Sequence, residues 1–174
     1  MRHFTQAPIH PTGWIAPYNV RMATLPDICI RGAGIVGRSL ALLLARERLR
    51  VALVDAPRNN LAPDVRAYSL NNEAKTLLEA LRCWPESPAV TPVHQMQVWG
   101  DDGGLLSFNA SDQGTSELNW MVDVPVLEAR LATAVQFQPL IEVVNTPVAA
   151  PLTVICEGRA SQTRAELGIG FDIT

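Results

Sequence analysis

The chain has 174 residues, which is long enough for one domain with a hydrophobic core and short for two. Its formal net charge of −3 excludes a general electrostatic attraction to nucleic acid or to an anionic membrane surface. Hydrophobic residues make up 48% of the chain, but no apolar segment reaches the roughly 20 residues of a membrane span, because Arg38 and Arg46 interrupt the best candidate.

The first 25 residues differ in character from the rest of the chain. They contain several prolines and two histidines, follow no period of 2 or 3.6, and lack the apolar core of a signal peptide. We therefore predict a disordered lead-in over residues 1–25. Two alternatives remain open: translation starts at Met22, or an N-terminal arm packs through Trp14 and Ile15.

The three cysteines, Cys29, Cys83 and Cys156, are odd in number and widely spaced. No Cys-x-x-Cys pair and no Cys/His cluster is present, so the sequence predicts neither a disulfide framework nor a metal site. This pattern favours reduced thiols and a cytoplasmic location.

A glycine-rich fingerprint dominates the first half of the chain. Residues 28–30 are apolar and predict a buried strand, and residues 32–37 (GAGIVG) match G-x-G-x-x-G. Residues 35–48 predict a helix, and Val51–Val54 predicts a second strand that ends at Asp55. A strand before the glycines, a helix after them and an acid about 20 residues on are together typical of a dinucleotide-binding unit.

Each glycine of the fingerprint has an expected role. Gly32 would make the tight turn, Gly34 would let a pyrophosphate approach the backbone, and Gly37 would let the helix pack on the sheet. Asp55 would accept hydrogen bonds from a ribose. The alternative is a strand–helix–strand unit whose glycines serve packing alone. The predicted phosphate-binding backbone, at the turn and the helix N-terminus, comprises Gly32, Gly34, Ile35, Val36 and Gly37.

A loop is expected after Asp55, over residues 56–65, and a second helix follows it. Ser69 is expected to cap this helix. Arg66 would lie between the second strand and the helix, near the nucleotide crevice, although an exposed loop arginine is the alternative. The predicted apolar face of the helix consists of Leu70, Ala74, Leu77, Leu78 and Leu81.

The middle of the chain, over residues 93–124, carries strand patterns. Residues 93–99 and 105–108, joined by a glycine-rich turn, predict a hairpin. Residues 122–124 predict a short strand, after which Asp123 and Pro125 begin a helix. His94 has no acidic or cysteine partner near it in the sequence, so we expect a structural role for it.

The last third of the chain predicts a second strand–turn–helix corner. Residues 139–145 indicate a weak strand and residues 152–156 a clear one. The second strand is followed by Glu157 and Gly158. An acid and a glycine at the carboxyl end of a parallel strand are well placed to contact a ligand.

Two motifs in this order, GAGIVG at residues 32–37 and CEGRASQTR at residues 156–164, resemble the class A flavoprotein aromatic hydroxylases, especially those of ubiquinone biosynthesis. Residues 66–84 (RAYSLNNEAKTLLEALRCW) resemble the arginine-containing loop and following helix of that family. The resemblance spans roughly residues 26–172.

The resemblance implies an α/β fold with a Rossmann-like FAD-binding sheet of the glutathione-reductase type. Residues 26–174 would form an incomplete N-terminal FAD-binding domain, in which residues 88–122 belong to the layer of a β-rich substrate domain. Family members continue to a Gly-Asp motif that binds the flavin ribityl chain. We therefore expect a truncated chain that does not hydroxylate alone, and whose open sheet edge favours self-association.

The resemblance also implies FAD as the cofactor. The glycines of the fingerprint would hold its pyrophosphate, Asp55 its adenosine ribose, and Arg66 would lie against the flavin nucleotide. Glu157 stands where the family has Asp, and it would contact FAD together with Gly158. The same motif, with Ser161 and Arg164, is implicated in NAD(P)H binding.

The implied activity is NAD(P)H-dependent hydroxylation of a small phenolic substrate that resembles a ubiquinone precursor. Because the flavin carries the chemistry, no catalytic triad is expected, and Ser39 lies in a predicted helix without a histidine partner. No catalytic residue is identified. Peripheral association with a membrane, association with a ubiquinone-pathway complex and homo-oligomer formation stay open. The alternative functions are a non-catalytic nucleotide-binding or interaction module and an NAD-dependent Rossmann oxidoreductase.

Overall fold

The structure is a computed structural model that describes residues 25–56, 64–159 and 161–170. The predicted lead-in therefore lies outside the described residues, apart from the exposed Leu25. Within the described residues, no helix is long and apolar enough to cross a membrane.

A four-stranded parallel sheet forms the centre of the fold, with the strand order β8-β2-β1-β9. The side chains of the two central strands are almost all buried, as is usual for parallel strands that are covered on both faces. The fold class predicted from the sequence is confirmed. The four strands are β1 (Ile28–Arg31), β2 (Val51–Val54), β8 (Ile141–Val144) and β9 (Leu152–Ile155).

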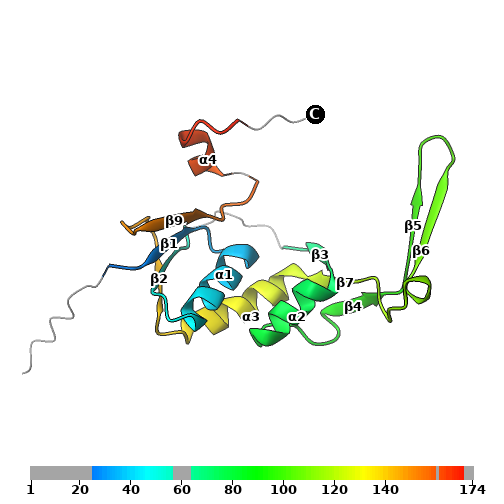
Figure 1. The fold of residues 1–174 in the computed structure, drawn as a ribbon, viewed down its shortest axis with the longest axis horizontal. Coiled ribbons are helices and arrows are strands. Elements are labelled where there is room, and N and C mark those ends of the chain that lie inside the picture. The colour runs from blue at the N-terminus through cyan, green and yellow to red at the C-terminus, as the bar shows by residue number, and fades with distance from the viewer. Residues whose placement is uncertain (1–24, 57–63, 160, 171–174) are drawn as a thin grey trace, which may run out of the picture.

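Two helices, α1 (Ile35–Arg46) and α3 (Val124–Gln136), pack against each other beside this sheet (Figure 1). The predicted helix over residues 35–48 ends two residues early, because Arg48 takes a left-handed φ of 64° and the Leu49 N–H returns to the Leu44 carbonyl. The buried core shared by these helices and the sheet includes Ile30, Ala41, Leu53, Leu127 and Leu131.

The second helix, α2 (Asn72–Ala80), begins later than predicted. Ser69 does not cap it, since Ser69 lies in β3 (Ala67–Leu70), which pairs with another strand. The cap is Asn71, whose Oδ1 accepts a hydrogen bond from the Ala74 N–H at 2.9 Å. Of the predicted apolar face, Leu78 is buried whereas Leu77 is exposed.

Antiparallel strands make two further small sheets. One has the order β3-β7-β4, with β4 at Val90–Val93 and β7 at Asn119–Asp123. The other is the predicted hairpin, β5 (Gln95–Trp99) with β6 (Leu105–Asn109), which projects away from the parallel sheet (Figure 1). A short 3₁₀ helix, η1 (Ser111–Gln113), follows β6.

The predicted strand over residues 93–99 is in fact divided at His94. This residue separates β4 from β5, which belong to different sheets. Its carbonyl accepts a hydrogen bond from the Ala110 N–H at 2.9 Å, and its ring Nδ1 lies 2.8 Å from the Ser116 carbonyl oxygen. These contacts hold the base of the hairpin. The assignment of residues 88–122 to a substrate-domain layer stays a prediction.

Candidate functional site

The N-terminus of α1 differs from the other α-helix starts in the described part of the chain. Helices α2, α3 and α4 (Gln162–Glu166) each begin with a side chain that accepts a backbone N–H, supplied by Asn71, Asp123 and Ser161 respectively. Helix α1 has Gly34 at its N-cap position, which supplies no side-chain cap. Its first-turn N–H groups are therefore available to an external acceptor such as a phosphate.

Two glycines are required by the way in which α1 leaves β1. Gly32 has a φ of +111°, and a Cβ on it would overlap the Cys156 carbonyl. A Cβ on the buried Gly37 would overlap the Gly32 carbonyl oxygen. Gly34, with φ −79° and ψ −171°, has a conformation open to any residue. The turn and the close packing expected at Gly32 and Gly37 are present, and the ligand-approach role of Gly34 stays a prediction.

The strand order places this turn at a switch point of the parallel sheet. From β1 the chain passes through α1 to β2 on one side, whereas β9 adds later on the other side of β1. The two connections diverge at the carboxyl ends of β1 and β9, where ligands of open α/β sheets bind. The Cys156 N–H donates to the Arg31 carbonyl at 2.7 Å. The segments that carry the two motifs, GAGIVG and CEGRASQTR, therefore begin side by side.

Asp55 lies directly after β2, and its backbone N–H donates to the Val144 carbonyl at 2.9 Å. Its Oδ2 is 3.1 Å from Nη2 of Arg38, a residue in the first turn of α1. The structure thus brings Asp55, the predicted ribose acceptor, close to the first turn of α1. Sequence reasoning missed Arg38, although a cation one residue after the third glycine of a G-x-G-x-x-G motif was a signal that pointed to it.

Glu157 lies two residues after the end of β9, and its carboxylate contacts α4. Its carboxylate accepts hydrogen bonds from the Ser161 hydroxyl at 2.6 Å and from the Thr163 hydroxyl and N–H at 2.6 and 3.0 Å. It also pairs with Nε of Arg31 at 3.2 Å. Burial acts to raise the pKa of Glu157, but these hydrogen bonds and the arginine outweigh it and lower the pKa to about 2.

The Glu157 carboxylate therefore holds the second corner together through contacts within the chain. Gly158, which follows it, has a φ of +75° and is exposed, with open space where a side chain would project. Ser161 also accepts the Arg164 N–H at 3.2 Å and so caps α4. Direct contact of Glu157 and Gly158 with a cofactor stays a prediction.

Arg66 lies directly before β3, outside the parallel sheet, and is exposed. Its Nη2 is 2.6 Å from an Asp64 carboxylate oxygen and 3.7 Å from one of Glu128, and its Nη1 donates to the Tyr68 hydroxyl at 3.2 Å. The hydrogen bonds that the Arg66 guanidinium donates to the Asp64 carboxylate raise the pKa of the guanidinium. A contact between Arg66 and a flavin nucleotide stays a prediction.

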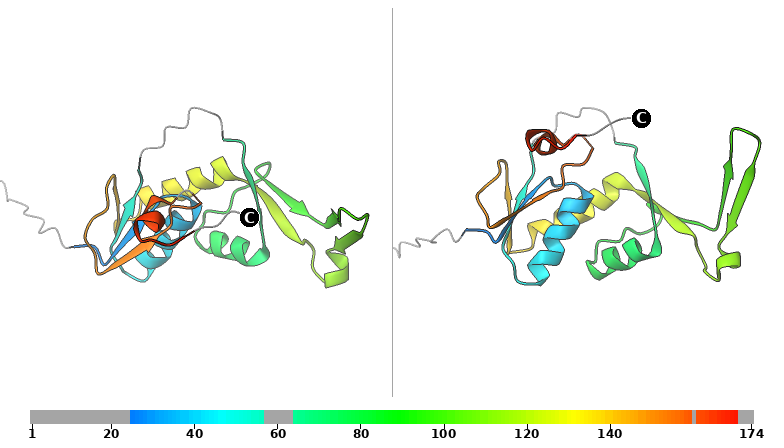
Figure 2. Two further views of the ribbon diagram at one scale, coloured as in Figure 1. Left: turned by 90° about the horizontal axis from the view of Figure 1, so that it is seen from above. Right: turned by 45° about the horizontal axis from the view of Figure 1, so that its top comes forward.

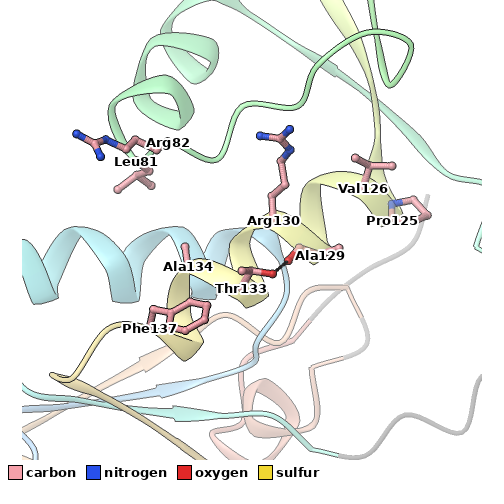
Figure 3. A pocket seen from close by; sticks show the side chains of 9 residues that line it. All are labelled: Leu81, Arg82, Pro125, Val126, Ala129, Arg130, Thr133, Ala134 and Phe137. Carbon is pink, nitrogen blue, oxygen red and sulfur yellow. Dashed lines mark hydrogen bonds between the residues drawn. The ribbon is translucent and has the colours of Figure 1, made fainter.

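A groove of about 920 Å³ lies apart from these residues, between the end of α2 and one face of α3 (Figure 3). It is largely apolar and contains none of the predicted site residues. Its lining consists of Leu81, Arg82, Pro125, Val126, Ala129, Arg130, Thr133, Ala134 and Phe137. Among the described residues, no group of three or more His, Cys, Asp or Glu side chains is arranged to hold a metal ion.

The corner between β1, α1 and β2 fits the pyrophosphate and ribose of a dinucleotide. It offers an uncapped helix N-terminus, backbone that Gly32 and Gly37 keep close-packed, and a carboxylate at the end of the neighbouring strand. These are the features that a dinucleotide such as FAD requires at its adenosine end.

The fold is similar to part of the fold of solved FAD-dependent monooxygenases. PqsL of Pseudomonas aeruginosa, a probable FAD-dependent monooxygenase, matches with a TM-score of 0.66 and 20% identity over 86% of this chain and 47% of that one. The p-nitrophenol 4-monooxygenase PnpA of Pseudomonas putida DLL-E4 matches with a TM-score of 0.61 and 16% identity, over 85% of this chain and 45% of that one. The flavin-dependent monooxygenase PieE, solved with FAD and substrate, matches with a TM-score of 0.62 and 16% identity, over 87% and 33%.

Among curated proteins, the chain is similar to the 3-demethoxyubiquinol 3-hydroxylase of Escherichia coli (strain K12). The two are 29% identical over 120 residues, which is 65% of this chain and 31% of the relative. No protein-family model matches the chain. The resemblance to FAD-dependent aromatic hydroxylases is confirmed, and the chain spans about a third of the curated relative and less than half of these solved structures.

Proposed function

We propose that this chain is the FAD-binding portion of an NAD(P)H-dependent flavin monooxygenase that acts on a small phenolic substrate. The observation that carries the proposal is the corner between β1, α1 and β2, called the α1 corner below. There, an uncapped helix N-terminus adjoins Asp55 at the end of β2. The similarity to a 3-demethoxyubiquinol 3-hydroxylase supports a substrate of the ubiquinone-precursor kind.

In this proposal the backbone of residues 34–37 holds the FAD pyrophosphate. The Asp55 carboxylate accepts hydrogen bonds from the adenosine ribose. Glu157 and Gly158 define the opposite side of the crevice at the end of β9. When bound, FAD supplies the oxidation–reduction chemistry, while the protein provides binding and orientation.

The test is a titration of the purified 174-residue chain with FAD, followed by gel filtration and the visible absorbance spectrum. We expect the flavin spectrum to elute with the protein. A Gly34→Val variant, which places a branched side chain where the pyrophosphate approaches, should lose the bound flavin. A Gly104→Ala variant is the control, since no atom lies within 4 Å of a Cβ at that hairpin position. Failure of the parent chain to retain FAD would contradict the proposal.

NAD(P)H oxidation by the flavin-loaded chain forms the second part of the test. Oxidation that depends on FAD and is lost in Gly34→Val would support the use of a nicotinamide donor. FAD binding without any oxidation of NAD(P)H would restrict the chain to a nucleotide-binding role. A preference for NAD over FAD in the titration would instead favour an NAD-dependent oxidoreductase.

A further inference from the structure

Arg38 is a mostly buried cation placed against the predicted ribose acceptor. Its side chain is 14% exposed, and its Nη2 lies 3.1 Å from Oδ2 of Asp55. The two residues are 17 positions apart, on α1 and at the end of β2. Their meeting therefore depends on the packing of the helix against the sheet.

The place of Arg38 on α1 is electrostatically unfavourable for the helix alone. A helix N-terminus carries a partial positive charge, so a cation in the first turn is repelled. The first turn of α1 contains no acidic residue that would offset this charge. Arg46, at the other end of the same helix, has the favourable position, and its Nη1 donates to the Ala80 carbonyl at 3.1 Å. Stabilisation of α1 therefore does not explain an arginine at position 38.

The contact with Arg38 leaves Asp55 able to accept hydrogen bonds from two hydroxyl groups of a ligand. An ionised carboxylate has about four acceptor positions, and the bond to Arg38 takes one of them. The side chain of Asp55 is 36% exposed, so its remaining acceptors are accessible to a ligand. A carboxylate already held in one orientation loses less conformational entropy when it binds.

We infer that Arg38 is a positioning residue that fixes Asp55 as the acceptor for the adenosine ribose of the dinucleotide. The inference rests on the proposed FAD site, because it assigns a role within that site. The cation also adds positive charge beside the helix N-terminus that would face the pyrophosphate.

The experiment compares ADP with 2′-deoxy-ADP, which differ by one ribose hydroxyl, by calorimetric titration of the 174-residue chain. The parent chain should bind ADP about tenfold more tightly, since a hydrogen bond to a charged group is worth about that much. In Arg38→Ala we expect this preference to fall to roughly two- to threefold, because Asp55 loses its fixed orientation. Arg38→Lys should restore most of the preference, and Arg46→Ala should leave it unchanged.

This comparison separates positioning from a structural role. If Arg38 only supported the fold, Arg38→Ala would weaken both ligands equally and leave their ratio as it was, which would overturn the inference. FAD binding by the parent chain together with an unchanged ratio would overturn the inference alone. If the parent chain bound neither FAD nor ADP, the proposed function and the inference would both be wrong.

Discussion

At the scale of single residues, the α1 corner depends on a missing methyl group. Gly37 is buried, and a Cβ there would overlap the Gly32 carbonyl oxygen. Backbone atoms cannot move aside as the end of a flexible side chain can, so α1 would have to shift away from β1. The same shift would displace the helix N-terminus from the switch point of the sheet.

We expect Gly37→Ala to lower the free energy of unfolding by about 1–3 kcal/mol, the range typical of overpacked sites. Urea denaturation followed by circular dichroism measures the change. Gly104→Ala, in the open turn of the hairpin, is the matched control. Equal stability of the two variants would show that the corner accommodates a side chain.

The carboxylate of Glu157 gives a second prediction, about pH. Its pKa of about 2 in the folded state lies below the usual 4.5, so the ionised group contributes stability above pH 4.5 that is lost as the pH falls toward 2. Glu157→Gln should therefore cost roughly 1–3 kcal/mol at neutral pH, as for hydrogen bonds to charged groups. This difference should shrink between pH 4.5 and pH 2.

Urea denaturation of the parent chain and Glu157→Gln across this pH range provides the measurement. Glu142→Gln is the control, since Glu142 is an exposed carboxylate on β8. A difference that stays constant down to pH 2 would contradict the assignment of the low pKa to Glu157.

At the scale of elements, the start of α2 shows how strand pairing overrides a local signal. Ser69 is a good capping residue, but its backbone is paired with Met121 of β7. Its hydroxyl accepts a hydrogen bond from the Asn119 side chain at 2.7 Å. The helix consequently begins after Asn71, two residues later.

We expect Asn71→Ala to lower the free energy of unfolding by about 1 kcal/mol, the usual cost of removing a helix cap. Asn71→Asp keeps the capping oxygen and should retain the stability. Ser69→Ala removes only the exposed hydrogen bond from Asn119 and no cap, so it should change the stability by less than about 0.5 kcal/mol, as surface substitutions do. Thermal melts of the three variants test the order, and a larger effect at position 69 would restore the original assignment of the cap.

At the scale of the whole molecule, the hairpin β5–β6 leaves an apolar face without cover in the described structure. Its cross-strand pairs put Met96 and Val98 opposite Phe108 and Leu106, and each of these side chains is between 37% and 62% exposed. Gln97 and its partner lie on the opposite face. An isolated two-stranded hairpin is only marginally stable in water, so this apolar face favours association.

We therefore expect the chain to self-associate as its concentration rises, through the apolar face of the hairpin. A Val98→Lys/Leu106→Glu double variant places opposite charges on directly paired residues and should yield a monomer. Gln97→Lys/Ser107→Glu makes the same change on the other face and should leave the association intact. Sedimentation velocity over a concentration series distinguishes them, and equal behaviour of the two variants would exclude the hairpin as the contact.

The sequence by itself determined the strand–helix–strand unit and its glycine turn. Residues 28–55 carry the apolar strands, the helix-forming segment and the glycines within one continuous stretch, so each signal is local. The hairpin was equally local, because its two strands are joined by a short glycine-rich turn. The start of α3 followed from Asp123, which caps it as expected.

Only the tertiary structure decided which distant residues meet. It brought Arg38 to Asp55 and Arg31 to Glu157, and it placed β4 and β5, on either side of His94, in different sheets. These contacts join residues that are far apart in the chain or belong to different sheets. Their free energy depends on which elements pack together, and local periodicity carries no information about that packing.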